Sequence, residues 1–332
     1  MMKKVKKGSA IVALLALVLS TVVIPKAYAA KEVDLSKTSS MEFDLSSVTY
    51  EEVKDLSIAV DLYQVATIDK VGNYTAVDGY TLGTIDDKTT ADAWIKMAED
   101  AMAVIEENAV APTATSTVED GFAGLELGLY LVVANNAQST TYEYSFTPYL
   151  VSLPNNYYYS QGNDAWVYDV TTSLKPERAD LYGDLVITKD LASYNATVGG
   201  ATFVFQVEAT KNYKLSEESA DDVKVVYSDV VSITFDAAGN KSVTIDNIPA
   251  GAEVTVTEVY SGGSYEAANG TEFTTVIVAD EVVEAEKDVV AAVTFTNQYN
   301  GKLNGGTGVV NHFEEGENGW TWTVDPASAE VK

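Results

Sequence analysis

Alternation between apolar and polar residues is the main regularity of this chain. In the segment AAVTFTNQYN, residues 291–300, Val293 and Phe295 alternate with two threonines, so one face of the predicted strand is apolar and the other polar. Asn297 then falls on the apolar face. A buried amide without hydrogen-bonding partners costs about 1–3 kcal/mol. The pattern therefore predicts that partners for this carboxamide lie inside the fold.

The second half of the chain is predicted to be a series of short strands. We expect them at about residues 185–191, 201–209, 223–235 (as one strand or two), 242–246, 253–260, 273–279 and 290–299. Turn sequences such as VGG, AAGN, PAG and SGG separate them. Several short strands at this spacing are typical of a β-sandwich.

The first half predicts a second β-domain with a helix inserted in it. The strand candidates are LSIAVDLYQVAT, GLELGLYLVVA, YSFTPYLVSLP and AWVYDVTTSL. Between about Thr90 and Asn108, apolar residues recur at helical spacing, which predicts a helix. The segment KPERADLYGD, residues 175–184, is predicted to be a linker, and the Gly- and Asn-rich residues 301–332 a flexible tail.

The first 29 residues have the pattern of a signal peptide. A basic start, MMKKVKKGSA, precedes an apolar run, and AYA ending at Ala29 fits a cleavage site. The apolar run is shorter than the roughly 20 residues of a membrane span. We therefore expect an exported chain whose mature form starts near Ala30 or Lys31, with a first domain over residues 30–175.

Charge and cysteine content narrow the possible functions. Without the signal segment, 16 basic residues remain against 49 acidic ones. No basic stripe is available to neutralise phosphates, which argues against nucleic-acid binding, whereas the charge suits a solvated extracellular surface. Cysteine is absent, so an exported protein of this kind lacks disulfides and either does without covalent cross-links or uses another kind.

Two further strands carry a charged residue on the face that should be apolar. In GDLVITKDL, Lys189 shares a face with Leu185 and Ile187, and in AEVTVTEVY, Glu258 shares one with two valines. Burial lowers the pKa of a lysine and raises that of a glutamate, by up to about 3–5 units. A neutral Lys189 amine is a nucleophile, and a protonated Glu258 can bind the Asn297 amide and give a proton to departing ammonia.

This chemistry would yield a Lys–Asn amide cross-link between the first and last strands of the second domain. Contact between the groups would supply the large effective molarity of an intramolecular reaction. The alternatives are a buried Lys–Glu ion pair with an asparagine bonded nearby, or three strand-edge residues that never meet.

Residues 184–300 resemble the CnaB-type domains of Gram-positive surface proteins and pilins. The matching residues are Lys189 in LVITKDL, Glu258 in VTVTEVY and Asn297 in VTFTNQY, and the run IDNIPAGAEVTVTE is similar to the one that precedes the acid in that family. The resemblance implies an isopeptide bond between Lys189 and Asn297, with Glu258 as its catalyst. Ala134 stands where a cross-linking first domain would place its acid, so no bond is expected there.

The first domain resembles the N-terminal domain of sortase-assembled pilins. FAGLELGLYLVVA, FTPYLVSLP and WVYDVTTSLKPE are similar to runs that lead to a lysine in a Tyr-Pro-Lys type motif, which a sortase joins to the next subunit. Lys175 in TSLKP is the corresponding residue, but Tyr and Pro are missing before it, and an ordinary exposed linker lysine is the alternative. No LPxTG-like sequence follows, so the anchoring route stays open between truncation, retention by partners and free secretion.

These observations predict an all-β fold of tandem immunoglobulin-like (CnaB-type) β-sandwich domains, the first with a helical insertion. We expect a structural pilin or fimbrial subunit, at the cell surface or in a pilus, whose partners are other pilin subunits joined through a sortase. The alternative is an adhesin whose first domain, with the loop NNYYYSQGNDAW, binds a host protein or glycan. A turnover enzyme ranks third, because no cleft chemistry can be named.

No cofactor or metal site is predicted. His312 is the only histidine and cysteine is absent, which makes a nucleophilic triad or a zinc cluster improbable. The acidic runs EESADD and ADEVVEAE lack the alternating pattern of a calcium-binding loop. We expect them to be solvated surface.

Overall fold

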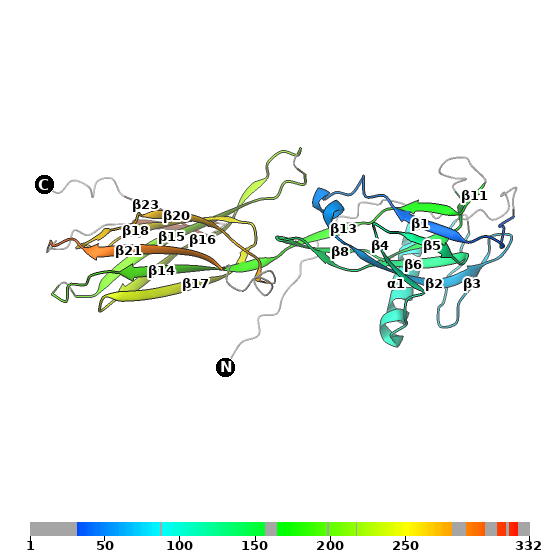
Figure 1. Cartoon of the computed structure of the whole chain (residues 1–332), viewed down its shortest axis with the longest axis horizontal. Coiled ribbons are helices and arrows are strands. Elements are labelled where there is room, and N and C mark those ends of the chain that lie inside the picture. Colours follow the sequence, from blue (N-terminus) through cyan, green and yellow to red (C-terminus); the bar gives the residue numbers. More distant parts are fainter. Residues whose placement is uncertain are drawn as a thin grey trace. The chain divides into compact units, whose positions relative to one another are not determined.

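The computed structural model describes residues 32–86, 88–156, 165–197, 199–216, 218–280, 290–302, 311–316 and 319–324. Two compact units make up the chain (Figure 1). The first consists of Met1–Ser47, Ser57–Asn135 and Phe146–Lys175, and the second of Val48–Leu56, Asn136–Ser145 and Pro176–Lys332. The signal segment lies outside the described residues. In the part of the chain that the structure describes, no helix is long and apolar enough to cross a membrane.

The first unit is built from short strands in several sheets. Its strands are β1 (Ser39–Phe43), β2 (Ala59–Ile68), β3 (Tyr74–Ala76), β4 (Ala114–Thr117), β5 (Phe122–Leu125), β6 (Gly128–Ala134), β9 (Tyr149–Leu153), β10 (Asn155–Asn156), β11 (Trp166–Val167) and β12 (Asp169–Thr172). One sheet has the order β3-β2-β6-β9, with β4 also paired to β2, and another has the order β12-β1-β5. A two-stranded sheet joins β10 and β11.

One helix, α1 (Ala91–Asn108), is inserted in the first unit, as the periodicity predicted. The Thr90 side chain accepts a hydrogen bond from the Ala93 amide and caps its start. The helix ends at Asn108 and is followed by Ala109, which adopts the left-handed conformation at its C-cap. Its apolar stripe packs on residues of β2, β6 and β9 in one hydrophobic cluster. The helix is therefore a layer of the core.

The second unit contains a sandwich of two four-stranded sheets. Its strands are β14 (Tyr182–Leu191), β15 (Ala201–Asn212), β16 (Val223–Phe235), β17 (Gly239–Pro249), β18 (Glu253–Tyr260), β19 (Tyr265–Ala267), β20 (Glu272–Val276) and β21 (Ala291–Tyr299). The sheet orders are β17-β14-β21-β19 and β16-β15-β18-β20. A cluster of buried apolar residues from both sheets fills the space between them. The all-β prediction of tandem sandwich-like domains is therefore confirmed.

The core of this sandwich follows the period-2 rule closely. Along β14, β15, β18 and β21, alternate residues are buried while their neighbours are partly or fully exposed, except that Tyr260 and Tyr299, at the ends of β18 and β21, are only partly buried. Strands β14 and β21, the first and last of the sandwich, are parallel neighbours and lie side by side in Figure 1. Their register pairs Lys189 with Phe295 and Leu191 with Asn297.

The predicted linker at residues 175–184 is wrong, because this segment is strand. Residues Pro176–Asp180 form β13, which extends a small sheet in the order β13-β8-β7 with β8 (Tyr142–Phe146) and β7 (Ala137–Gln138). A short 3-10 helix, η1 (Glu51–Asp55), also belongs to the second unit. This segment is rich in polar residues because one face of the strand is exposed, and its residues alternate between partly buried and exposed.

Several other strands were absent from the sequence prediction, among them β1, β3, β4, β7, β10 and β19. Strand β19 has only three residues, too few for a period to be read. Strands β22 (Asn311–Gly316) and β23 (Gly319–Val324) pair as an antiparallel hairpin within the segment predicted to be a tail. Residues 223–235, left open between one strand and two, form the single strand β16.

Candidate functional site

The structure brings Lys189, Glu258 and Asn297 together inside the second unit. Lys189 lies on β14 and Asn297 on the adjacent β21 of one sheet, while Glu258 lies on β18 of the facing sheet. Each occupies the position at which the alternation of its strand places a core residue. The expectation that all three face the core is confirmed, with exposures of 0% for Lys189 and Asn297 and 5% for Glu258.

One carboxylate oxygen joins the three groups. Lys189 Nζ lies 3.0 Å from Glu258 Oε1, and Asn297 Nδ2 donates a hydrogen bond of 3.0 Å to the same oxygen. The two nitrogens are therefore within twice that distance of each other. The contact between Lys189 Nζ and Glu258 Oε1 is short enough for an ion pair. It is not a hydrogen bond, since Nζ has no hydrogen-bond partner among the described residues.

Burial moves both ionisable groups toward their neutral forms. Desolvation lowers the pKa of Lys189, and the nearby Glu258 carboxylate opposes this shift only in part. Desolvation likewise raises the pKa of Glu258 against the opposing effect of Lys189. The desolvation penalty of burying two charges exceeds the attraction between them unless their remaining polar atoms are also hydrogen-bonded. Here they are not, so a neutral amine beside a neutral acid is the favoured state.

The site contains unsatisfied acceptors. Among the described residues, Glu258 Oε2 and Asn297 Oδ1 are buried and have no hydrogen-bond partner. An unpaired buried polar atom costs about 1–3 kcal/mol. A proton on Glu258 would give this cluster the donor that it lacks. The Asn297 carboxamide, which the sequence predicted to need partners, thus has one for its nitrogen and, among the described residues, none for its oxygen.

Aromatic rings enclose the amine and keep water away from it. Lys189 Nζ lies 4.5 Å from the ring centroid of Phe203 and 6.0 Å from that of Phe205. Phe205 in turn packs on Phe295, with ring centroids 4.9 Å apart. These phenylalanines lie on core-facing positions of β15 and β21. The sequence analysis assigned these phenylalanines no role, although the alternation along their strands places them on the same core as Lys189.

A second buried lysine, Lys211 on β15, was also missed. It is 3% exposed and lies 2.6 Å from Asp180 Oδ1, while the Tyr213 hydroxyl donates to Asp180 Oδ2 at 2.8 Å. Lys211 Nζ sits 3.9 Å from the ring centroid of Tyr142. Lys211 falls on the core-facing set of β15, so the counting that singled out Lys189 could have found it too.

Lys175, the candidate acceptor for a sortase, is partly buried rather than fully exposed. Burial lowers the pKa of its amine. It directly precedes β13, and its carbonyl accepts a hydrogen bond from the Thr147 amide at 3.5 Å. Lys175 is the last residue of the first unit, whereas the three residues of the buried cluster belong to the second.

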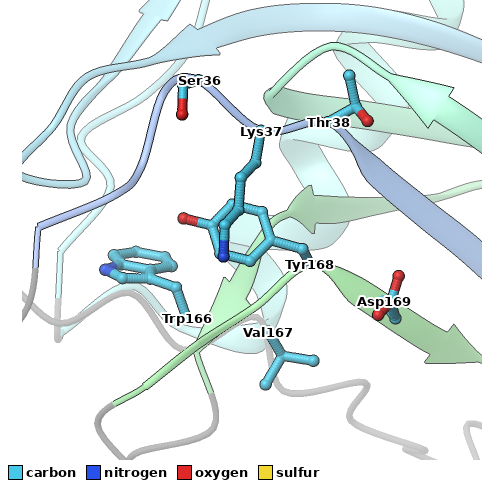
Figure 2. Close-up of a pocket in the computed structure, with 7 residues that line it drawn as sticks. All are labelled: Ser36, Lys37, Thr38, Trp166, Val167, Tyr168 and Asp169. Atoms are coloured by element: carbon cyan, nitrogen blue, oxygen red, sulfur yellow. The ribbon is translucent and has the colours of Figure 1, made fainter.

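The first unit carries an open hollow of about 660 Å³ (Figure 2). Its lining residues are Ser36, Lys37, Thr38, Trp166, Val167, Tyr168 and Asp169. Figure 2 shows Lys37 lying across Tyr168, and its Nζ is 4.6 Å from that ring centroid. The Tyr168 hydroxyl accepts from the Asp34 amide, and Asp169 accepts from Ser40. These polar groups serve the local fold. Most of the tyrosine-rich loop predicted as a recognition element, residues 157–164, lies outside the described residues.

Comparisons with known proteins give the second unit a family match. The family DUF5979, described as a domain of unknown function, matches residues 185–300. These are nearly the residues that resemble CnaB-type domains, and they contain all three members of the buried cluster. No curated protein sequence matches the chain.

Several solved structures of pilins are similar to this chain at low identity. A minor pilin of Streptococcus agalactiae is 12% identical over 78% of this chain and 94% of its own, with a TM-score of 0.22. The full-length major pilin of Corynebacterium diphtheriae is 14% identical over 74% of this chain and 66% of its own, with a TM-score of 0.28. A major pilin of Streptococcus pyogenes is 12% identical over 78% of this chain and 95% of its own, with a TM-score of 0.24. Likenesses with TM-scores this low support no statement about the role of this chain.

Proposed function

We propose that this protein is a structural subunit of a cell-surface fibre, and that its second unit is stabilised by a self-formed amide bond between Lys189 and Asn297. Glu258 carries the proton between the two nitrogens. The observation that carries the proposal is the single oxygen, Glu258 Oε1, which lies 3.0 Å from both nitrogens in a dry interior.

The proposed step is a transamidation that balances without any co-reactant. The neutral Lys189 amine attacks the side-chain carbonyl carbon of Asn297, and the C–N bond to the primary amide nitrogen breaks. Glu258 takes a proton from the attacking nitrogen and delivers one to the leaving nitrogen, so one amide forms and one ammonia departs. Fixed contact between the groups supplies the effective molarity that such a reaction lacks in water.

The role as a fibre subunit rests on the sequence. The resemblance to sortase-assembled pilins, the acidic surface and the lack of cysteine all fit an exported protein that must resist force and proteolysis without disulfides. A bond between the first and last strands of a sandwich would serve that purpose, because tension on the two ends of the domain would load the bond before the hydrogen bonds of the sheet. The proposed partners are other subunits of the same fibre.

Intact mass of the purified full chain tests the bond. We expect a deficit of one ammonia relative to the mature sequence, and no deficit in Lys189→Ala after the substitution itself is counted. Lys211→Ala is the matched control, because it removes the other buried lysine of the same unit and should retain the deficit. A wild-type chain at its unmodified mass would contradict the proposal.

Assembly through Lys175 is tested separately, in cells that supply the sortase and the other subunits. We expect ladders of covalent multimers in the wild type and their loss in Lys175→Ala. Lys37→Ala, which changes an exposed lysine of the same unit, should leave the ladders intact. Ladders that persist in Lys175→Ala would show that another lysine is the acceptor.

A further inference from the structure

Strand β21, which carries Asn297, is held very differently along its two edges. On one side it pairs in parallel with β14 over seven residues, from Ala291 to Asn297. On the other side, β19 pairs with it over only three residues, from Asn297 to Tyr299. Among the described strands, none therefore pairs on that edge with the stretch that leads up to Asn297.

The side chain of Asn269 takes the place of the missing strand. Its Nδ2 donates to the Thr294 carbonyl at 2.9 Å, and its Oδ1 accepts from the Thr296 amide at 2.8 Å. The Ala268 amide adds a bond of 2.7 Å to the Thr296 carbonyl. A carboxamide presents a donor and an acceptor as a peptide group does, so these bonds continue the ladder of β19 past its end.

We propose that Asn269 is a positioning residue, which fixes the strand that presents Asn297 to Lys189. This role rests on the proposed cross-link. We call the two hydrogen bonds of the Asn269 side chain to this strand the clamp. Thr294 and Thr296 flank Phe295, the register partner of Lys189, so the clamp acts directly beside the reacting pair. Intramolecular reactions lose about 10²-fold in rate when the reacting groups are misplaced by roughly 1 Å. A loose edge at this point would therefore slow the reaction even where the fold survives.

Asn269 is exposed, which separates this role from core packing. Its loss leaves the Thr294 carbonyl and the Thr296 amide to water, so the domain should still fold. A matched control lies two positions beyond Thr296 on the same strand, where the Gln298 side chain donates to Glu266 at 2.9 Å. Gln298 also links β21 to β19 and is also exposed, but it makes no bond to the backbone that precedes Asn297.

The rate of ammonia loss tests the proposal. The full chain is made by cell-free synthesis and quenched into denaturant at intervals, and the unreacted fraction is read by intact mass. We expect Asn269→Ala to react about tenfold more slowly, the effect of about 1.4 kcal/mol of lost hydrogen bonding. Asn269→Gln, which keeps the carboxamide, should recover part of the rate, and Gln298→Ala should match the wild type. Equal rates for Asn269→Ala and the wild type would overturn the proposal.

Hydrogen exchange separates failure of this role from failure of the cross-link. In a Lys189→Met background, which cannot react, Asn269→Ala should speed exchange of the Thr296 amide, whereas Gln298→Ala should not. An unchanged Thr296 amide would overturn the clamp. A wild-type chain that keeps its ammonia while Thr296 is protected would instead overturn the cross-link, and the positioning role with it.

Discussion

Among its described residues, the second unit buries two lysines against acids, Lys189 and Lys211, and only the first pair is arranged to react. Lys189 is 0% exposed and Lys211 is 3% exposed, and each lies close to an aromatic ring. Burial lowers the pKa of both amines. Burial of the amine alone therefore does not distinguish them.

The acids differ. The side chain of Glu258 is 0% exposed, and one of its oxygens has no hydrogen-bond partner among the residues that the structure describes. The side chain of Asp180 is 18% exposed, and both its oxygens accept hydrogen bonds. Glu258 also accepts from a carboxamide, which the described contacts of Asp180 do not include. A dry, incompletely bonded acid beside an amide favours proton transfer, and a hydrated, fully bonded one favours a lasting ion pair.

The surroundings of the acid therefore decide whether a buried lysine reacts or forms a lasting ion pair. Asp180 is reached by water, and two side chains, Lys211 and Tyr213, satisfy its oxygens. Arg178 adds to this network, because it lies 4.1 Å from the ring centroid of Tyr142, on which Lys211 also packs. These contacts hold β8, β13 and the end of β15 together. The account therefore assigns chemistry to the first lysine and packing to the second.

Lys189→Met is expected to lower the free energy of unfolding more than any other substitution considered for the two lysine pairs. It removes the amine, keeps much of the volume, and leaves the first and last strands without a covalent link. A bridge that closes a loop of roughly 100 residues contributes about 4–5 kcal/mol by its effect on the unfolded chain. We expect a loss of this size in the free energy of unfolding, measured by denaturant titration. A loss no greater than that of Lys211→Met would show that the wild type carries no bridge.

Glu258→Gln tests the proton transfer. The substitution keeps the shape and the contact with Asn297 but removes the group that moves a proton. General acid–base catalysis contributes about 10²–10⁴-fold, and we expect the rate of ammonia loss to fall by that factor, measured on freshly synthesised chains. Asp180→Asn is the matched change at the other pair, and it should leave the rate unchanged.

The pH dependence of the reaction tests the protonation states proposed for Lys189 and Glu258. Burial lowers the pKa of Lys189, so the reactive neutral amine becomes scarcer as the pH falls. Burial raises the pKa of Glu258, so its proton is lost as the pH rises. The rate of ammonia loss should therefore be bell-shaped in pH, with apparent pKa values that belong to the pair. A rate that rises steadily with pH would mean that Glu258 need not be protonated.

Lys211→Met should destabilise the second unit less than Lys189→Met does. It removes one member of an ion pair whose acid is partly hydrated, so the expected loss lies between those of exposed and buried pairs, about 2 kcal/mol. The deficit of one ammonia should persist, as intact mass would show. Loss of the deficit in this variant would contradict the division of roles between the two lysines.

Much of the second unit could be predicted from alternation alone. Strands β14, β15, β18 and β21 bury alternate residues over most of their length, so counting by two located their core faces. The same count singled out Lys189 on β14 and Glu258 on β18, although it was not applied to Lys211 on β15. The method failed where strands are short or exposed on one side. Strand β13 is rich in charge, because its residues face water or pair with other side chains, and it was therefore taken for a linker.

The candidate site was predictable in its residue types but not in its contacts. Spacing identified Lys189, Glu258 and Asn297, but it could not reveal that two of them share one oxygen, because that depends on how the two sheets pack. The clamp at Asn269 was beyond sequence reasoning for a related reason. The dipeptide Asn269–Gly270 predicts a turn, and nothing in it shows that the side chain bonds to a strand more than twenty residues away.

Peptide mapping of the full-length wild-type protein would locate the proposed bond between Lys189 and Asn297. The chain is digested after denaturation, and the fragments that contain Lys189 and Asn297 are identified by tandem mass spectrometry. The account predicts one branched peptide in which these two side chains share an amide, lighter than its two parts by one ammonia, with Lys211 recovered as an ordinary lysine. Separate, unmodified peptides for Lys189 and Asn297 would contradict it.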